Sequence, residues 1–254
     1  MSQTSYNIEQ GEAYAGMKVD SRFDTVESKL MEAPANAAVP FGIGLMSGNE
    51  DAVNQVRRPA KTKSVLTAST DLVTSNSTIV TINGTALDPV VYADSHADTM
   101  AAIAAAIEAD DAVLTATYPG SGDDITIIGA DGVAIDASAV TTGGAGQPTW
   151  TQVQSDPGVV RGILVHRHVE KAQTTGVAAL YDTDSADVLR VGEIWMPYTD
   201  TPEVDAALYF ELGAAGSEGY ATDESSGNIA VPGGKIREVN ATLGLLKANI
   251  NLPQ

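Results

Sequence analysis

The stretch "HADTMAAIAAAIEADD" (residues 96–111) decides how the fold is read, because it alone has a clear helical pattern. Its larger apolar side chains recur three and four positions apart, which places them on one face of a helix. Asp94 or Ser95 can cap this helix, and Ser95 followed three positions later by Asp98 resembles a capping box. The helix is expected to end at the two closing aspartates. The predicted buried face consists of Met100, Ile103, Ala104 and Ile107.

Short strands are predicted on both sides of this helix. In "STIVTINGTALDPVVYA" (77–93), polar and apolar residues alternate around Asn83-Gly84, a pair typical of a two-residue hairpin turn. After the helix, "AVLTATY" (112–118) reads as a strand. "DITIIGADGVAIDASAV" (124–140) reads as a second hairpin that turns at Asp131-Gly132. One helix can cover one face of such a small sheet, so this region is predicted to be a two-layer α/β unit.

The charge pattern marks the limits of that unit. Between Ser64 and Gln154 there is no Lys or Arg, and the segment holds eleven Asp and Glu residues. The linkers "RRPAKTKS" (57–64) and "TTGGAGQPTWTQVQSDPG" (141–158) flank it. We therefore predict an inserted acidic domain, the insertion, at residues 64–154. Residues 1–63 with 155–254 are called the base.

The base reads as almost entirely β. Apolar runs such as "AVPFGIGLMSG" (38–48) and "VLRVGEIWMPY" (188–198) alternate with frequent turn signals, as in a sandwich or barrel. Residues 1–12 are expected to form an extended N-terminal arm. The predicted fold class is mainly β, with a sandwich-like base and an inserted two-layer α/β domain.

The composition argues against several kinds of partner. The net charge is −19, and this disfavours binding to nucleic acid or to anionic membranes. The chain has no Cys, so it has no disulfides and no cysteine zinc site. The first residues lack the basic and apolar regions of a signal peptide, and no run is long and apolar enough for a membrane helix.

Several stretches of the base resemble tailed-bacteriophage capsid cement (decoration) proteins. They are "YAGMKVDSRFDTVESKLMEAPANAAVPFGIGLMSG" (14–48) with "VRRPA" (56–60), "GVVRGILVHRHV" (158–169), and the C-terminal run from "VGEIWMPY" (191–198) to "GLLKANINLP" (244–253). The resemblance covers roughly residues 10–62 and 157–253. It implies a jelly-roll β-sandwich without catalytic activity that binds the outside of the assembled shell at seams between capsomers.

The insertion departs from the shorter cement pattern. The runs "STIVTINGTALDPVVYADSHADTMAAIAAAI" (77–107), "ITIIGADGVAI" (125–135) and "TTGGAGQ" (141–147) are similar to a module found in varied phage structural proteins. The insertion is expected to project outward from the particle. An alternative function is a host-surface or glycan-binding module displayed by the base, against which the insertion's few aromatic residues argue.

No catalytic or cofactor-binding pattern is found. G-x-S-x-G and G-x-x-x-x-G-K-[ST] motifs are absent from the sequence, so a hydrolase is disfavoured and no cofactor is predicted. His166 and His168 would share one face of a strand, but a metal site needs three or four ligands and no third is near in sequence. The acids of "YDTDSADVLRVGE" (181–193), which are Asp182, Asp184 and Asp187, are read as a solvated turn.

Two groups of residues are predicted to contact a capsid. Arg57, Arg58, Lys61 and Lys63 form a basic cluster in an acidic chain, which is either a solubilising linker or a contact to an acidic partner. Tyr6, Ile8 and Tyr14 are the apolar candidates of the N-terminal arm. The expected partners are the major capsid protein and further copies of the chain, as a homodimer or a homotrimer. The expected location is the capsid exterior, after assembly in the host cytoplasm.

Overall fold

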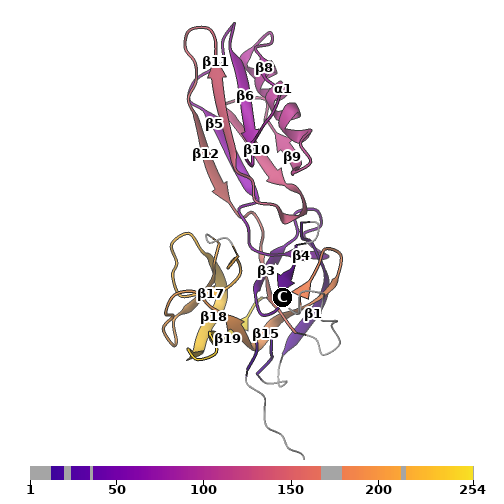
Figure 1. Ribbon diagram of the computed structural model, residues 1–254, viewed down its shortest axis with the longest axis vertical. Coiled ribbons are helices and arrows are strands. Elements are labelled where there is room, and N and C mark those ends of the chain that lie inside the picture. The colour runs from indigo at the N-terminus through magenta and orange to yellow at the C-terminus, as the bar shows by residue number, and fades with distance from the viewer. Residues whose placement is uncertain (1–12, 20–23, 35–36, 167–178, 213–215, 254) are drawn as a thin grey trace, which may run out of the picture.

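The structure is a computed structural model that describes residues 13–19, 24–34, 37–166, 179–212 and 216–253. In these ranges the chain forms nineteen β-strands, the single α-helix α1 and the short 3-10 turn η1. The prediction of a mainly β, sandwich-like fold with one helix is confirmed. Figure 1 shows the insertion and the base as two bodies, one above the other along the longest axis.

A nine-stranded sheet forms most of the base. A two-stranded sheet of β14 (Ala179–Leu180) and β2 (Val39–Pro40) accompanies it. In spatial order the large sheet contains β1 (Thr25–Met31), β4 (Gln55–Arg57), β3 (Gly44–Ser47), β13 (Val160–Leu164), β15 (Ser185–Pro197), β19 (Leu245–Asn251), β18 (Ile229–Asn240), β16 (Ala207–Phe210) and β17 (Ala221–Thr222).

Part of this sheet closes on itself. β1 pairs with β4 on one side and with the first half of β15 on the other, so β1, β4, β3, β13 and β15 form a ring. Successive residues of the ring strands enter different apolar cores, because side chains alternate across a strand. For example, Leu45 and Leu164 belong to one core, and their neighbours Met46 and Ile163 belong to the other. The base therefore has two cores that share these strands.

The insertion contains two four-stranded sheets rather than the single sheet expected. Its helix α1 (His96–Glu108) contacts strands of both, and all three elements share one apolar core. The first sheet consists of β12 (Trp150–Ser155), β5 (Lys63–Ala68), β10 (Asp124–Gly129) and β9 (Val113–Thr117). The second consists of β11 (Ala137–Thr142), β6 (Ser77–Ile82), β7 (Thr85–Ala86) and β8 (Val90–Val91), which pairs with β6.

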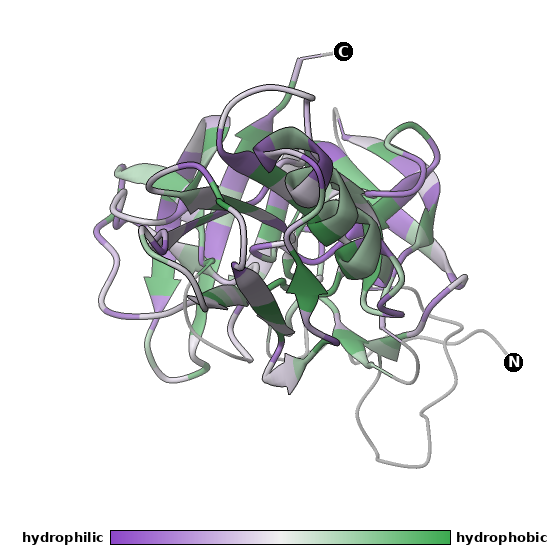
Figure 2. Cartoon of the chain, turned by 90° about the horizontal axis from the view of Figure 1, so that it is seen from above, coloured by the Kyte–Doolittle hydropathy of each residue, from purple (hydrophilic) through white to green (hydrophobic). Residues whose placement is uncertain are grey.

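The predicted helix is confirmed in position and in its buried face. Met100, Ile103, Ala104 and Ile107 are all buried. Ser95 is the N-cap, since its Oγ accepts a hydrogen bond from Asp98 N at 3.1 Å. Ser95 Oγ also donates to Asp98 Oδ2 at 2.6 Å, so the acid binds the cap side chain directly. In Figure 2 hydrophobic and hydrophilic colouring both occur along the strands, as expected for strands with one buried and one exposed face. Within the described ranges no helix could span a membrane.

One of the two predicted hairpins is confirmed and the other is wrong. β6 and β7 form the hairpin at Asn83-Gly84, with φ values of 48° and 84° at the two turn residues. Asp131 and Gly132 also have positive φ, at 48° and 69°, within η1 (Ala130–Gly132). However, β10 pairs with β5 and β9, whereas β11 pairs with β6. Ile135, which lies between β10 and β11 in sequence, is buried in the core of the insertion. The turn therefore connects a strand of one sheet to a strand of the other, and the two strands that flank it do not pair with each other.

Candidate functional site

Arg57 lies in the joint between base and insertion, not on the surface. Its guanidinium forms a two-pronged ion pair with Asp156, with Nη1 at 2.9 Å from Oδ2 and Nη2 at 2.6 Å from Oδ1. Both side chains are only 1% exposed. The prediction that Arg57 contacts a capsid is therefore corrected, because its donors are already used inside the protein.

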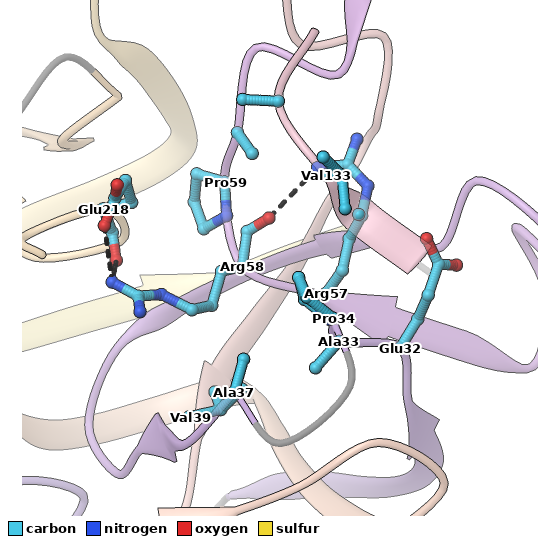
Figure 3. Close-up of a pocket in the computed structure, with 13 residues that line it drawn as sticks. Glu32, Ala33, Pro34, Ala37, Val39, Arg57, Arg58, Pro59, Val133 and Glu218 are labelled. Atoms are coloured by element: carbon cyan, nitrogen blue, oxygen red, sulfur yellow. Dashed lines mark hydrogen bonds and ion pairs between the residues drawn. The ribbon is translucent and has the colours of Figure 1, made fainter. Parts of the chain in front are cut away.

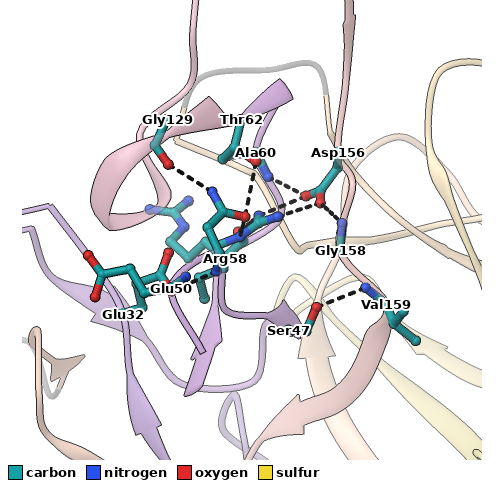
Figure 4. A network of polar contacts seen from close by, with 12 residues as sticks. Glu32, Ser47, Glu50, Arg58, Ala60, Thr62, Gly129, Asp156, Gly158 and Val159 are labelled. Atoms are coloured by element: carbon teal, nitrogen blue, oxygen red, sulfur yellow. Dashed lines mark hydrogen bonds and ion pairs between the residues drawn. The ribbon is translucent and has the colours of Figure 1, made fainter. Parts of the chain in front are cut away.

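The Arg57–Asp156 pair also holds together the two chain crossings, which are the segments by which the chain enters and leaves the insertion (Figure 4). The chain enters the insertion after β4 and returns after β12, and Asp156 accepts hydrogen bonds from both passages. Ala60 N donates to its Oδ2 at 2.8 Å, and Gly158 N donates to its Oδ1 at 2.8 Å. Asn49 adds a third tie, because its Oδ1 accepts from Arg57 Nε at 3.0 Å and its Nδ2 donates to Gly129 O at 3.0 Å. The crossings are thus fixed in position by a buried polar network.

The sequence pattern did not reveal this network. Asp156 stands in a linker that reads as a turn, and its partner Arg57 is 99 positions away. Asn49 had no apparent role for the same reason. One sequence feature could have predicted the pair. The linker "SDPG" (155–158) contains a single acid and the linker "RRPA" (57–60) contains two arginines, and an acid in one linker can form an ion pair with an arginine in the other.

Arg58 borders a groove of about 410 Å³ beside the joint (Figure 3). Its Nη2 is 2.6 Å from Glu218 Oε2, and the two side chains are 27% and 25% exposed. Water therefore reaches this pair, unlike the pair of Arg57. The groove is lined mostly by small apolar side chains, among them Ala33, Pro34, Ala37, Val39, Pro59, Ala60, Val133 and Ala134.

Lys61 and Lys63 remain available to a partner. Both are half-buried, and neither forms an ion pair with any part of the chain that the structure describes. Lys61 lies where the chain enters the insertion, and its carbonyl accepts a hydrogen bond from Ile135 N at 3.1 Å. Lys63 is the first residue of β5. Of the four predicted basic contacts, these two are the cations that form no ion pair with a described residue.

Tyr14 is 43% exposed and packs its edge against the ring of His166, with ring centroids 5.0 Å apart. His166 also contacts Phe41, at 4.7 Å between ring centroids. The imidazole of His166 therefore packs in an aromatic cluster with Tyr14 and Phe41. The other arm candidates, Tyr6 and Ile8, lie outside the described residues, as does His168.

The acids of the 181–193 stretch have local structural roles. Asp182 Oδ1 accepts a hydrogen bond from Ala33 N at 3.3 Å, and Asp184 Oδ2 accepts from Tyr181 N at 2.8 Å. Ser28 Oγ donates to Asp187 Oδ1 at 2.9 Å. Asp182 and Asp184 are exposed turn residues, as the sequence suggested, whereas Asp187 is half-buried in strand β15 and is not part of the turn.

Asp71, His96 and Asp123 form a cluster that the sequence did not predict, with one potential ligand atom of each within 4.8 Å of the others. The hydrogen bonds of His96 argue against a metal there. Its Nδ1 accepts from Leu72 N at 2.9 Å, so the ring proton of a neutral imidazole is on Nε2. Nε2 faces Gly122 O at 3.3 Å and Asp123 Oδ1 at 3.2 Å, which suits a donor. If a metal bound Nε2, the ring proton would be on Nδ1, where it would face the N–H of Leu72 and the hydrogen bond between them would be lost. His96 instead ties two loops to the start of α1.

The arrangement as a whole is that of a structural protein. Among the described residues, the most buried ion pair, Arg57–Asp156, joins two parts of one chain, and Lys61 and Lys63 lie beside that joint. The family model described as "Structural cement protein (E217 gp24/Pam3 gp6)", a phage cement family, matches residues 99–251, which is more than half of the chain. The chain belongs to this family of phage structural cement proteins.

The matched region begins within α1 and includes residues 99–154 of the insertion, as well as residues 157–251 of the predicted cement-like stretch 157–253. The other predicted stretch, 10–62, lies outside it. One solved chain, described as "The capsid of Myoviridae Phage XM1", is similar with a TM-score of 0.45 and 12% identity. That similarity covers 94% of this chain and 89% of the other. Comparison with curated proteins finds no match.

Proposed function

We propose that this cement protein binds the exterior of a phage head through its base and stabilises contacts between major capsid protein subunits. Membership in the cement family carries the proposal. Each interface is small, but repetition over a lattice makes the combined effect large. The insertion, at residues 64–154, would project outward, and its negative charge would keep particles apart in solution.

The charge distribution supports this orientation. All 14 Lys and Arg residues lie outside 64–154, so cations that can pair with an acidic shell belong to the base. Lys61 and Lys63 are our first candidates for such contacts, together with the N-terminal arm of residues 1–12. A self-association of copies on the shell, as dimers or trimers, would increase the avidity.

The insertion offers little for the alternative role in glycan binding. Its aromatic residues Tyr92, Tyr118 and Trp150 are half-buried and pack against its own core. Trp150 Nε1 donates to Thr141 Oγ1 at 2.9 Å, and Tyr118 Oη donates to Gly122 O at 3.2 Å. Sugar stacking requires exposed aromatic faces, which these contacts do not favour.

The lysine contacts can be tested by co-sedimentation with expanded empty shells, followed by thermal melting of the shells. The double variant Lys61→Glu/Lys63→Glu should reduce affinity about tenfold or more, because it reverses two charges facing an acidic surface. The matched control Lys235→Glu/Arg237→Glu makes the same charge change on exposed residues of β18. Equal losses in both variants would show that only net charge matters.

A deletion tests whether the base is sufficient. Lys63 and Ser155 are cross-strand neighbours in the β5–β12 pair, so a two-residue turn can replace residues 64–154. The Arg57–Asp156 pair remains in this shortened chain. It should bind shells and raise their melting temperature as the full chain does. A shortened chain that folds but does not bind would identify the insertion as the binding element.

A further inference from the structure

The first sheet of the insertion turns one face outward, away from the apolar core that it shares with α1. Along β5 every second residue is buried, so Lys63, Val65 and Thr67 lie on the opposite, outward face. The cross-strand neighbours of Val65 are Val153 on β12, which is 65% exposed, and Thr126 on β10. The middle of this outward face is therefore an uncharged row of two valines and a threonine.

Only two charged residues occur in the four strands of this sheet, and they lie at opposite ends of the outward face. Lys63 lies at the end nearest the base, where β5 begins and β12 ends (Figure 1). Asp124 lies at the far end beside Thr67, whose Oγ1 donates to Asp124 Oδ1 at 2.6 Å. Neither Lys63 nor Asp124 forms an ion pair with a described residue. The other acids of the insertion lie on α1 or in loops and turns.

This placement of charge makes the outward face complementary to itself. When two copies pack face to face with antiparallel strands, about a two-fold axis along the middle row, the end that holds Lys63 in one copy lies over the end that holds Asp124 in the other. The symmetry produces this contact twice, and the valines of the middle row meet their own equivalents. Packing with parallel strands would instead bring equal ends together and leave both charges without an opposite partner.

We propose that the outward face is a dimer interface, on which a second copy of the chain docks with antiparallel strands. The net charge of the chain is −19, so two copies repel each other wherever their acids meet. The outward face keeps every acid of the insertion except Asp124 away from the contact, and Lys63 of the other copy neutralises that one. The two faces pack through β-branched side chains, as the inner faces of a β-sandwich do.

The antiparallel dimer holds its two bases at opposite ends, with the two insertions side by side between them. Lys63 is also a proposed shell contact, so within the proposed function a chain in this dimer cannot use the side chain on a shell. Dimerisation of the free protein and binding to a shell therefore compete for Lys63.

A charge exchange tests the arrangement on the free, full-length chain. Sedimentation velocity over a range of concentrations at low salt should show a monomer–dimer equilibrium for the native chain. Lys63→Glu and Asp124→Lys should each weaken the dimer about tenfold or more, because each places like charges together at both ends of the interface. The double variant Lys63→Glu/Asp124→Lys exchanges the two charges, so it should recover most of the native affinity.

Val153→Glu tests the middle row, because it places an acid of each copy in the uncharged part of the interface. Its matched control is Val91→Glu, the same change at a 69% exposed site on β8 of the second sheet. Thermal melting shows which variants are folded. A native chain that stays monomeric at every concentration, a folded double variant as weak as the single ones, or equal effects of Val153→Glu and Val91→Glu would each overturn the proposal. No shell enters these measurements, so failure of the cement role would leave their result intact.

Discussion

The base and the insertion are both β-rich, but they close their sheets in different ways. In the base, β1 pairs with β15 and completes a ring of strands by backbone hydrogen bonds. In the insertion, β12 and β9 are the outer strands of one sheet, and α1 packs against β9, β8, β10 and β6. The helix thus covers the core where the two sheets are not hydrogen-bonded to each other. This explains why a mainly β protein contains one helix.

The two regions also differ in how they use charge. The base pairs its acids with cations, as in Arg190–Glu27 at 2.8 Å and Lys247–Glu238 at 3.0 Å. The insertion has no Lys or Arg between residues 64 and 154, so its acids are mostly solvated. Stability of the insertion must therefore come from its apolar core and caps, whereas the joint depends on a buried ion pair. Four substitutions test this contrast.

The largest effect is expected at the joint. Arg57→Ala leaves Asp156 buried without a partner, which should lower the free energy of unfolding by about 3–5 kcal/mol. Chemical denaturation followed by circular dichroism measures this. The control Arg57→Met/Asp156→Leu removes both charges and should recover most of the loss. If Arg57→Ala costs under about 1 kcal/mol, the joint does not depend on this pair.

Within the insertion, the largest loss of stability is expected for a substitution on the buried face of α1. Ile103→Asp places a charge in the core and removes apolar contacts, which should cost on the order of 3 kcal/mol. Ala102→Asp, on the exposed face of the same helix, is the matched control. If the two parts unfold separately, only the transition of the insertion should move. Equal effects of the two substitutions would contradict the burial of this face.

Local patterns predicted the insertion well where neighbours in sequence are neighbours in space. The helix, its cap at Ser95 and the hairpin at Asn83-Gly84 all depend on residues within a few positions. The turn at Asp131-Gly132 was predicted, but its strand partners were not, because they come from other parts of the chain.

The roles of the two linker arginines could not be predicted from the sequence either. Arg57 and Arg58 are adjacent and chemically identical, yet one is buried against Asp156 and the other is half-exposed against Glu218. The partners lie 99 and 160 positions away. A local charge pattern gives a cluster of cations, and only the folded chain decides which of them is free.

The helix cap should have an intermediate effect. Ser95→Ala removes the acceptor for Asp98 N, and the loss of an N-cap typically costs about 1 kcal/mol. Thermal melting of the insertion measures this, and Ser95→Asn should retain most of the stability, since Asn caps as well as Ser. No shift in Ser95→Ala would show that α1 is held by packing alone.

The smallest stability effect is expected for Arg58. Its pair with Glu218 is partly open to water, and such pairs contribute roughly 0–1 kcal/mol, so Arg58→Gln should melt close to the native protein.

Shell binding need not follow stability. Because Arg58 is a predicted contact beside the unpaired lysines, its loss should weaken shell binding if the groove faces the shell. Glu218→Gln separates the two roles, since it breaks the same pair but leaves Arg58 free. It should therefore bind shells at least as tightly as the native chain. Equal weakening by both variants would mean that the pair shapes the groove and that Arg58 makes no contact of its own.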